Sequence, residues 1–301
     1  MASAVVVQTH DAPPDAGRVA QHRLVELEAL WSRFAEGSDL DRLNRAGGEP
    51  VTVSRATITL LRTMAEGAEV SEHRYDPTIL PALLDAGYRA SVDDPERVTE
   101  LPPGHHRSGV GLADMEVDNE HRTATLPAGV AIDPGGIGKG LAADLVAELL
   151  VSKGAAGALV SIGGDVAMAG EAPRPAGWVI EVEDPHEPSR AVARMAVRAG
   201  GVATSSTLSR RWQGRSGSTH HVIDPTTGAP STTDLATVTV VASRAWLAEV
   251  HATGALLGGS GDVSAYADRH RLNLLAIDHA GRRVVTDGLM PTLLREELVQ
   301  R

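Results

Sequence analysis

The segment DPGGIGKGLAADLV, residues 133–146, constrains this chain more than any other stretch. Four glycines, a proline and a lysine fall within its first eight positions, and a helical pattern follows. A glycine-rich turn that leads into a helix can bind an anion, because backbone N–H groups point outward and the helix N-terminus favours negative charge. A purely structural turn between a strand and a helix is the alternative, and the motif alone leaves both open.

Two common phosphate-binding motifs do not match this segment. A P-loop requires G-x-x-x-x-G-K-[ST], but Asp133 stands where the first glycine belongs and Gly140 follows Lys139. The dinucleotide fingerprint G-x-G-x-x-G also fails, because Leu141 stands where the third glycine is required. Any phosphate site here must therefore be of another kind.

Composition limits the classes of function that are open to the chain. Its 301 residues suffice for a large core, which must depend on Leu, Val, Ile and Ala because aromatic residues make up only 3%. A net charge of −11 argues against a nucleic-acid surface, and the absence of cysteine excludes disulfides and thiolate chemistry. With no signal-like N-terminus and no apolar run of about 18 residues, we expect a soluble, cytoplasmic chain without a membrane segment.

Periodicity predicts an α+β fold in a single domain that spans residues 1–301. Three helices are expected in the first half. The first carries Leu24, Leu27, Trp31 and Phe34, and the second is capped by Ser54 and carries Ile58, Leu61, Ala65 and Ala68. The third carries Leu141, Leu145 and Leu149. The second half is predicted to be richer in strands, with a turn at 224–230 and a helix at 244–257 that ends near Gly258–Gly259. Strands are expected at 3–9, as a pair within 109–132, and at 158–162, 178–183, 195–198, 201–206, 236–242, 273–277 and 282–286.

Eight segments occur in an order that resembles the FAD:protein FMN transferase family, also called the ApbE family. The resemblance spans almost the whole chain, and the blocks 133–165 and HHVIDPTTG are its most specific parts. The segments are MAS (1–3), WSRFAEGSDLDRLN (31–44), YDPTILP (75–81), DPGGIGKGLAAD (133–144), SIGGDVAMAG (161–170), GVATSS (201–206), HHVIDPTTGAP (220–230) and AEVHATGALL (248–257).

The resemblance implies a fold, a reaction and partners. It implies a compact α+β protein that holds FAD in a deep pocket, with Mg²⁺ at the pyrophosphate. The implied reaction moves FMN from FAD to a Thr or Ser hydroxyl of an acceptor protein and releases AMP. Two alternatives stay open: an FAD pyrophosphatase that forms FMN and AMP, and a flavin-binding protein without turnover.

The resemblance also implies roles for individual residues. Positions that match nucleotide contacts are Met1, Phe34, Tyr75, Asp76, Pro77, Asp133, Lys139 and His221. Gly136, Glu249 and Thr253 match metal positions, and Glu249 and Thr253, four residues apart, would share one helix face. Lys139 and His221 are the candidate catalytic groups, the first to offset phosphate charge and the second to orient or deprotonate the incoming hydroxyl.

This chain departs from the family pattern at three places. Glu249 replaces the usual Asp at the metal position, the segment SEHRYDP lacks the usual preceding Gly, and Met-Ala-Ser replaces Met-Gly-Thr. Only the first change touches the chemistry directly, because Mg²⁺ demands near-ideal geometry. A serine-hydrolase interpretation of Ser205–Ser206 is poor, since no flanking glycines form a nucleophile elbow.

Overall fold

The computed structural model describes residues 3–105, 109, 111–214 and 217–294. Two units divide these residues: unit 1 takes Leu24–Gly138 and Arg210–Ser231, and unit 2 takes Ser3–Arg23, Lys139–Ser209 and the described chain from Thr232 onward. Helices and strands occur in both units, so the α+β prediction is confirmed, while the single domain over 1–301 stays a prediction. No helix among the described residues is long and apolar enough to cross a membrane.

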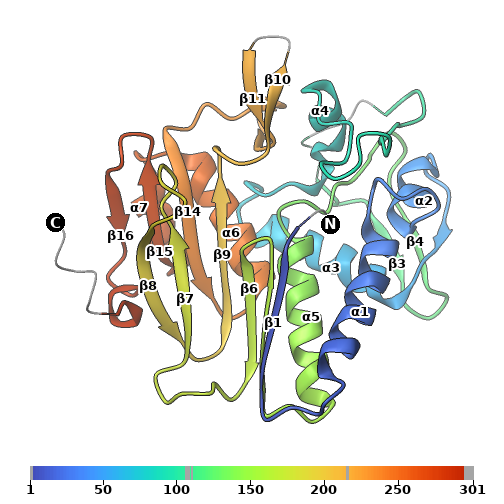
Figure 1. Ribbon diagram of the computed structural model, residues 1–301. Coiled ribbons are helices and arrows are strands. Elements are labelled where there is room, and N and C mark those ends of the chain that lie inside the picture. The colour runs from blue at the N-terminus through green and yellow to red at the C-terminus, as the bar shows by residue number, and fades with distance from the viewer. Residues whose placement is uncertain (1–2, 106–108, 110, 215–216, 295–301) are drawn as a thin grey trace. The chain divides into compact units, whose positions relative to one another are not determined.

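Unit 2 is built around a seven-stranded sheet in which every neighbouring pair is antiparallel (Figure 1). The strand order is β1-β5-β6-β9-β14-β15-β16, so each strand predicted in the second half finds a place in the sheet or in its covering hairpin. The bounds are β1 (Val5–His10), β5 (Gly157–Ile162), β6 (Asp165–Gly170), β9 (Gly200–Ser206), β14 (Leu235–Ala242), β15 (Asn273–Asp278) and β16 (Arg283–Val285).

The two faces of this sheet have different covers. On one face lies the hairpin of β7 (Trp178–Glu183) and β8 (Ala191–Val197), whose alternating apolar residues pack with Val202 and Ile277 of the sheet. Helix α6 (Ala245–Gly258) covers the opposite face beside β9, and α7 (Val263–His270) follows it. The described part of unit 2 also contains the short helix η2 (Met290–Thr292).

Two glycines allow the start of α6 to approach its neighbours closely. A Cβ on Gly201 of β9 would lie 2.2 Å from backbone atoms of Ala245, and one on Gly140 of α5 (Gly138–Ser152) would lie 2.6 Å from the Ala245 carbonyl carbon. The Asp144 carboxylate of α5 accepts hydrogen bonds of 3.1 Å from the N–H groups of Ala245 and Trp246. Asp144 thus caps α6 from another helix, and its burial raises the pKa of its carboxyl group.

Unit 1 combines helices with short strands. Helix α1 (Ala16–Trp31) begins in unit 2 and ends in unit 1. The helices that follow are α2 (Asp39–Arg45), α3 (Arg55–Val70), η1 (Pro77–Ile79) and α4 (Leu80–Asp85). The strands are β2 (Val51–Thr52), β3 (Glu116–Asp118) and β4 (Thr123–Thr125), then the hairpins of β10 (Arg211–Gly214) with β11 (Gly217–His220) and of β12 (Ile223–Asp224) with β13 (Ala229–Pro230).

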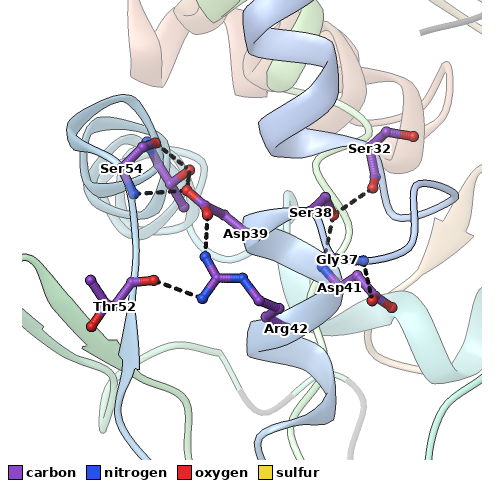
Figure 2. Close-up of polar contacts among 9 residues, drawn as sticks. Ser32, Gly37, Ser38, Asp39, Asp41, Arg42, Thr52 and Ser54 are labelled. Carbon is purple, nitrogen blue, oxygen red and sulfur yellow. Dashed lines mark hydrogen bonds and ion pairs between the residues drawn. The ribbon is translucent and has the colours of Figure 1, made fainter.

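One carboxylate ties α2 to α3 (Figure 2). Asp39, the first residue of α2, accepts hydrogen bonds from the Ser54 N–H at 2.8 Å and the Thr57 hydroxyl at 2.7 Å, and it pairs with Arg42. Ser54 caps α3 as predicted, because its hydroxyl accepts the Thr57 N–H at 3.0 Å. Burial alone would raise the pKa of Asp39, but the hydrogen bonds from Thr57, Ser54 and Arg42 outweigh it and lower that pKa.

One detail of the predicted helices is wrong, and the buried residues of another needed the structure. Helix α1 ends at Trp31, and Phe34 lies beyond it in a turn where the Ser32 hydroxyl accepts the Phe34 N–H. In α5, Leu145 and Leu149 are only half-buried, whereas Val146 and Leu150 are fully buried. Helix α5 is apolar around most of its circumference, so leucine spacing alone does not show which of its residues are most buried.

We predict that Asp39→Ala lowers the free energy of unfolding by about 2–3 kcal/mol at pH 7, because the N–H and hydroxyl donors at α3 lose a charged acceptor. A carboxyl group with a lowered folded-state pKa contributes stability above its unfolded pKa of about 3.9, and this contribution disappears as pH falls through the folded-state value. The difference between wild type and variant should therefore shrink below about pH 4. Urea denaturation from pH 7 to pH 3 measures it, with exposed Asp114→Ala as the control.

Candidate functional site

The glycine turn at the end of unit 1 is held by its own backbone and by one carboxylate. Asp133 donates its N–H to the Pro77 carbonyl at 2.8 Å, and its Oδ1 accepts the Gly135 N–H at 2.7 Å. Gly136 has a φ of +87°, a backbone conformation that side-chain-bearing residues rarely adopt. The Gly138 N–H then donates to the Pro134 carbonyl at 2.7 Å, and α5 begins. Glycine at position 136 is thus required by the conformation of the turn.

The Asp133 carboxylate is paired with an arginine that the sequence analysis did not single out. Arg33 Nε lies 2.7 Å from Asp133 Oδ2, and the exposed fraction is 4% for Arg33 and 7% for Asp133. Burial lowers the pKa of Arg33 from its usual value, while the charge of Asp133 opposes that change. Both oxygens of Asp133 accept hydrogen bonds within unit 1, so the predicted contact with a flavin nucleotide stays a prediction.

The Tyr75–Asp76–Pro77 segment is buried and leads into η1, which begins at Pro77 with Asp76 as its N-cap. Asp76 Oδ1 accepts both the N–H and the hydroxyl of Thr78 at 2.7 Å, and Pro77 occupies the first helical position. This segment is joined to the glycine turn through the Pro77 carbonyl, and Phe34 follows Arg33 directly. The structure therefore brings four of the predicted nucleotide positions, Phe34, Asp76, Pro77 and Asp133, into one connected region of unit 1.

His221 lies between β11 and β12 in unit 1 and is half-buried. Its neighbour His220 is buried, and His220 Nδ1 accepts the Val222 N–H at 3.3 Å. The two histidines thus have different environments, and His221 is the one with the greater exposure. The DPTTG turn that follows joins β12 to β13, as predicted. A role for His221 as a base stays a prediction.

Unit 2 carries a cluster of three charged side chains. Lys139, in the first turn of α5, pairs with Asp165 at the start of β6 and with Glu249 of α6, the latter at 2.6 Å. Glu249 Oε2 also accepts the Gly140 N–H at 2.8 Å. Asp165 and Glu249 are 2% and 3% exposed, so one ammonium group serves two buried carboxylates. The cluster offers both a fixed positive charge and hard oxygen donors.

The charges in this cluster shift one another's proton affinity. Burial and the nearby Asp165 carboxylate outweigh the attraction of Lys139 and raise the pKa of Glu249 to about 7. Burial would lower the pKa of Lys139, but the two carboxylates reverse this effect and raise it, so Lys139 is a stable cation. Shifted pKa values of this kind occur both at functional sites and in structural networks of ion pairs.

Thr253 lies one turn after Glu249 on α6, as the spacing predicted, but the two side chains have different partners. The Thr253 hydroxyl forms a hydrogen bond of 2.9 Å with that of Ser205 on β9. Within the described residues, no three His, Asp or Glu side chains gather closely enough to hold a metal ion by themselves. A cation at α6 would therefore need hydroxyl, backbone or water oxygens in addition to carboxylates.

The predicted site residues divide between the two units. Unit 1 contains Phe34, Tyr75, Asp76, Pro77, Asp133, Gly136 and His221, and unit 2 contains Lys139, Glu249 and Thr253, while Met1 lies outside the described residues. Sequence analysis missed Arg33, Asp165 and Ser205 as partners of the predicted residues. All three lie within or beside the quoted motifs, and this position was the one sequence feature that could have indicated them. Residue type alone did not distinguish them from ordinary polar positions.

We predict that Lys139→Met lowers the free energy of unfolding by about 3–5 kcal/mol, because it leaves two buried carboxylates without their cation. Adding Glu249→Gln should recover part of the loss, since one of the two buried charges is then removed. Guanidinium denaturation at pH 8 measures both effects. Lys153→Met, just after the end of α5, is the matched control at an exposed position and should change stability by less than about 0.5 kcal/mol. If Lys139→Met and Lys153→Met had the same free energy of unfolding, Lys139 would not stabilise the buried carboxylates.

Comparison with known proteins identifies the family to which the chain is similar. The model of the ApbE family matches residues 1–277. The FAD:protein FMN transferase of Treponema pallidum is 31% identical over 250 residues, which cover 78% of this chain and 69% of that protein. The one from Salmonella typhimurium is 30% identical over 279 residues, which cover 89% and 79% of the two chains.

Solved structures show the same fold. The ApbE protein of Thermotoga maritima matches with a TM-score of 0.82 at 24% identity and 96% coverage of both chains. The flavin transferase ApbE of Vibrio cholerae matches with a TM-score of 0.74 at 22% identity, with 97% of this chain and 100% of that chain covered. Because the family model matches most of its length and its fold matches that of an ApbE structure, this chain belongs to the ApbE family.

Proposed function

We propose that this protein transfers FMN from FAD to a Thr or Ser hydroxyl of an acceptor protein and releases AMP. The observation that carries the proposal is Lys139, a permanent cation in the first turn of α5, directly after the glycine turn and in a chain of the ApbE family. Relatives such as that of Treponema pallidum bear the name of this reaction. Phosphoryl transfer depends on positioning and charge neutralisation more than on covalent catalysis, which suits such a site.

Mg²⁺ is the proposed metal, and the donor chemistry of unit 2 suits it in part. Glu249 and Asp165 supply carboxylates and Thr253 and Ser205 supply hydroxyls, all hard oxygen donors. Glu249 already binds Lys139 and Gly140, so Lys139 would share its carboxylate with the metal or move to a phosphate oxygen. When bound, the metal supplies positive charge against the charge that develops on the phosphate. The backbone of Gly136 stays the proposed further contact.

Each reacting group has a proposed role. The acceptor hydroxyl oxygen forms a bond to the FMN-side phosphorus while the bond from that phosphorus to the AMP oxygen breaks. His221 takes the hydroxyl proton, and AMP departs with the negative charge. Lys139 stabilises the charge on the phosphate oxygens. Phe34, Asp76 and Asp133 are among the proposed nucleotide contacts.

The proposal predicts the products of one incubation. With FAD, Mg²⁺ and a Thr-bearing acceptor peptide, mass spectrometry should show the peptide with one FMN attached, together with an equal amount of AMP. The peptide with Thr replaced by Val should stay unmodified, and EDTA should suppress transfer because the phosphate charge is then not neutralised. Release of AMP without any modified peptide would favour the pyrophosphatase alternative, and FAD binding without either product would favour a binding protein.

We predict that His221→Ala lowers the rate of FMN transfer by about 10²-fold or more at saturating FAD, which is the range of general-base contributions. FAD affinity should change little, because the imidazole is assigned to the hydroxyl proton. The measurement is covalent flavin fluorescence of the acceptor after denaturing electrophoresis. His220→Ala is the adjacent control, to be compared after its stability is measured, since His220 is buried. Transfer at the wild-type rate by His221→Ala would remove the base assignment.

A further inference from the structure

We propose that Arg33 is a positioning residue for the flavin nucleotide, which acts through Asp133 to hold the glycine turn in its binding conformation. This inference rests on the proposed function, because it assigns the turn to nucleotide binding. Arg33 takes no direct part in the chemistry, and its effect is expected on affinity for the phosphate-bearing ligand. The contacts of Arg33 and of Asp133 all lie within unit 1.

The Arg33 guanidinium is fixed in three directions. Its Nε binds Asp133 at 2.7 Å, one terminal nitrogen donates to the Thr99 hydroxyl at 2.8 Å, and the other donates to the Tyr88 carbonyl at 2.9 Å. The Thr99 hydroxyl donates in turn to the Arg33 carbonyl at 3.0 Å. With 4% of its surface exposed, Arg33 has no freedom to choose other partners. The position of the guanidinium therefore determines where the Asp133 carboxylate lies.

Asp133 transmits that position to the turn. Its second oxygen holds the Gly135 N–H, and its own N–H is bound to Pro77. If the Arg33 bond were lost, the carboxylate could rotate and release Gly135, which precedes the positive-φ residue Gly136. The N–H groups that a glycine turn offers to an anion depend on this backbone conformation.

The ion pair also removes an electrostatic obstacle. A buried carboxylate beside a phosphate site would repel the anionic ligand, and the effect is strong where water is excluded. Arg33 neutralises Asp133 at 2.7 Å, so the turn keeps its carboxylate anchor without a net negative charge. Arg33 therefore contributes to affinity for phosphate in two ways, through geometry and through charge.

Lysine cannot replace this arginine. The guanidinium carbon lies 4.0 Å from the centre of the Phe34 ring and 5.0 Å from that of Tyr88, so a flat cation packs against two aromatic rings. Tyr88 in turn stacks on Trp212 with ring centres 5.3 Å apart and planes at 18°. The ammonium group of lysine keeps the positive charge, but it lacks the planar shape of the guanidinium group and its three nitrogen donors at fixed angles. Arg33→Lys thus isolates positioning from charge.

The test is a double-mutant cycle on the dissociation constant of FAD, measured by calorimetry on the full chain. Arg33→Lys should weaken FAD binding by about 10-fold, in line with one charged hydrogen bond, and leave the rate at saturating FAD within about 2-fold. In the Asp133→Asn background, Arg33→Lys should cause no further loss, because both variants break the same link. Thr99→Val, which keeps both charges, should weaken binding by a smaller factor.

Arg42→Lys is the matched control, since Arg42 pairs with the buried Asp39 of the same unit but touches no part of the turn. It should leave FAD affinity unchanged, and melting temperatures of all variants separate stability from binding. Additive losses in the cycle, or an equal loss for Arg42→Lys, would overturn the proposal. If the wild type binds FAD but transfers no FMN, the proposed reaction is wrong, while the affinity results still decide the role of Arg33. If the wild type does not bind FAD, the proposed reaction and the proposed role of Arg33 are both wrong.

Discussion

A single ammonium group between two buried carboxylates is the interaction that holds three elements of unit 2 together. Lys139, Asp165 and Glu249 come from α5, β6 and α6, so the cluster joins a helix, a sheet and a second helix. Removing two carboxylates from water is costly, and only close, well-placed partners compensate for that cost. The Gly140 N–H supplies one such partner at 2.8 Å, and the backbone of α5 thus contributes to the site together with its lysine.

Glycine is the means by which these elements come close enough. Gly140 and Gly201 leave room for the start of α6, where a Cβ on either would collide with Ala245. Without that approach, Glu249 of α6 could not span to both Lys139 and the Gly140 N–H. The glycines of the 133–140 segment therefore have two separate causes. Gly136 is required by its positive φ in unit 1, and Gly140 by helix packing in unit 2.

Local patterns in the sequence predicted the elements that local physics determines. The alternation in β7, the Ser54 cap of α3 and the end of α6 at Gly259 all follow from nearest neighbours along the chain. Short α2 was missed because its stability depends on bonds from Asp39 to residues 15 and 18 positions away. The partners of Lys139 are 26 and 110 residues distant, so spacing could not reveal them. The family resemblance proposed Lys139 and Glu249 as site residues, but it did not propose Asp165 or Arg33.

Glutamate at position 249 is explained by the distance it has to cover. One of its oxygens reaches Lys139 and the other reaches the Gly140 N–H, so the carboxylate binds α6 to the first turn of α5. The aspartate usual at this position in the family would be shorter by one methylene. It would have to give up one of these contacts, because the helices cannot move closer together where Gly140 already touches Ala245. In this chain the same side chain therefore serves helix packing and the proposed metal site. Since Lys139 already holds one of its oxygens, a metal ion at the proposed site would compete with the lysine for Glu249, and a phosphate that attracted Lys139 away would favour the metal. Binding of nucleotide and metal would then be mutually reinforcing, as a consequence of charge balance at one carboxylate.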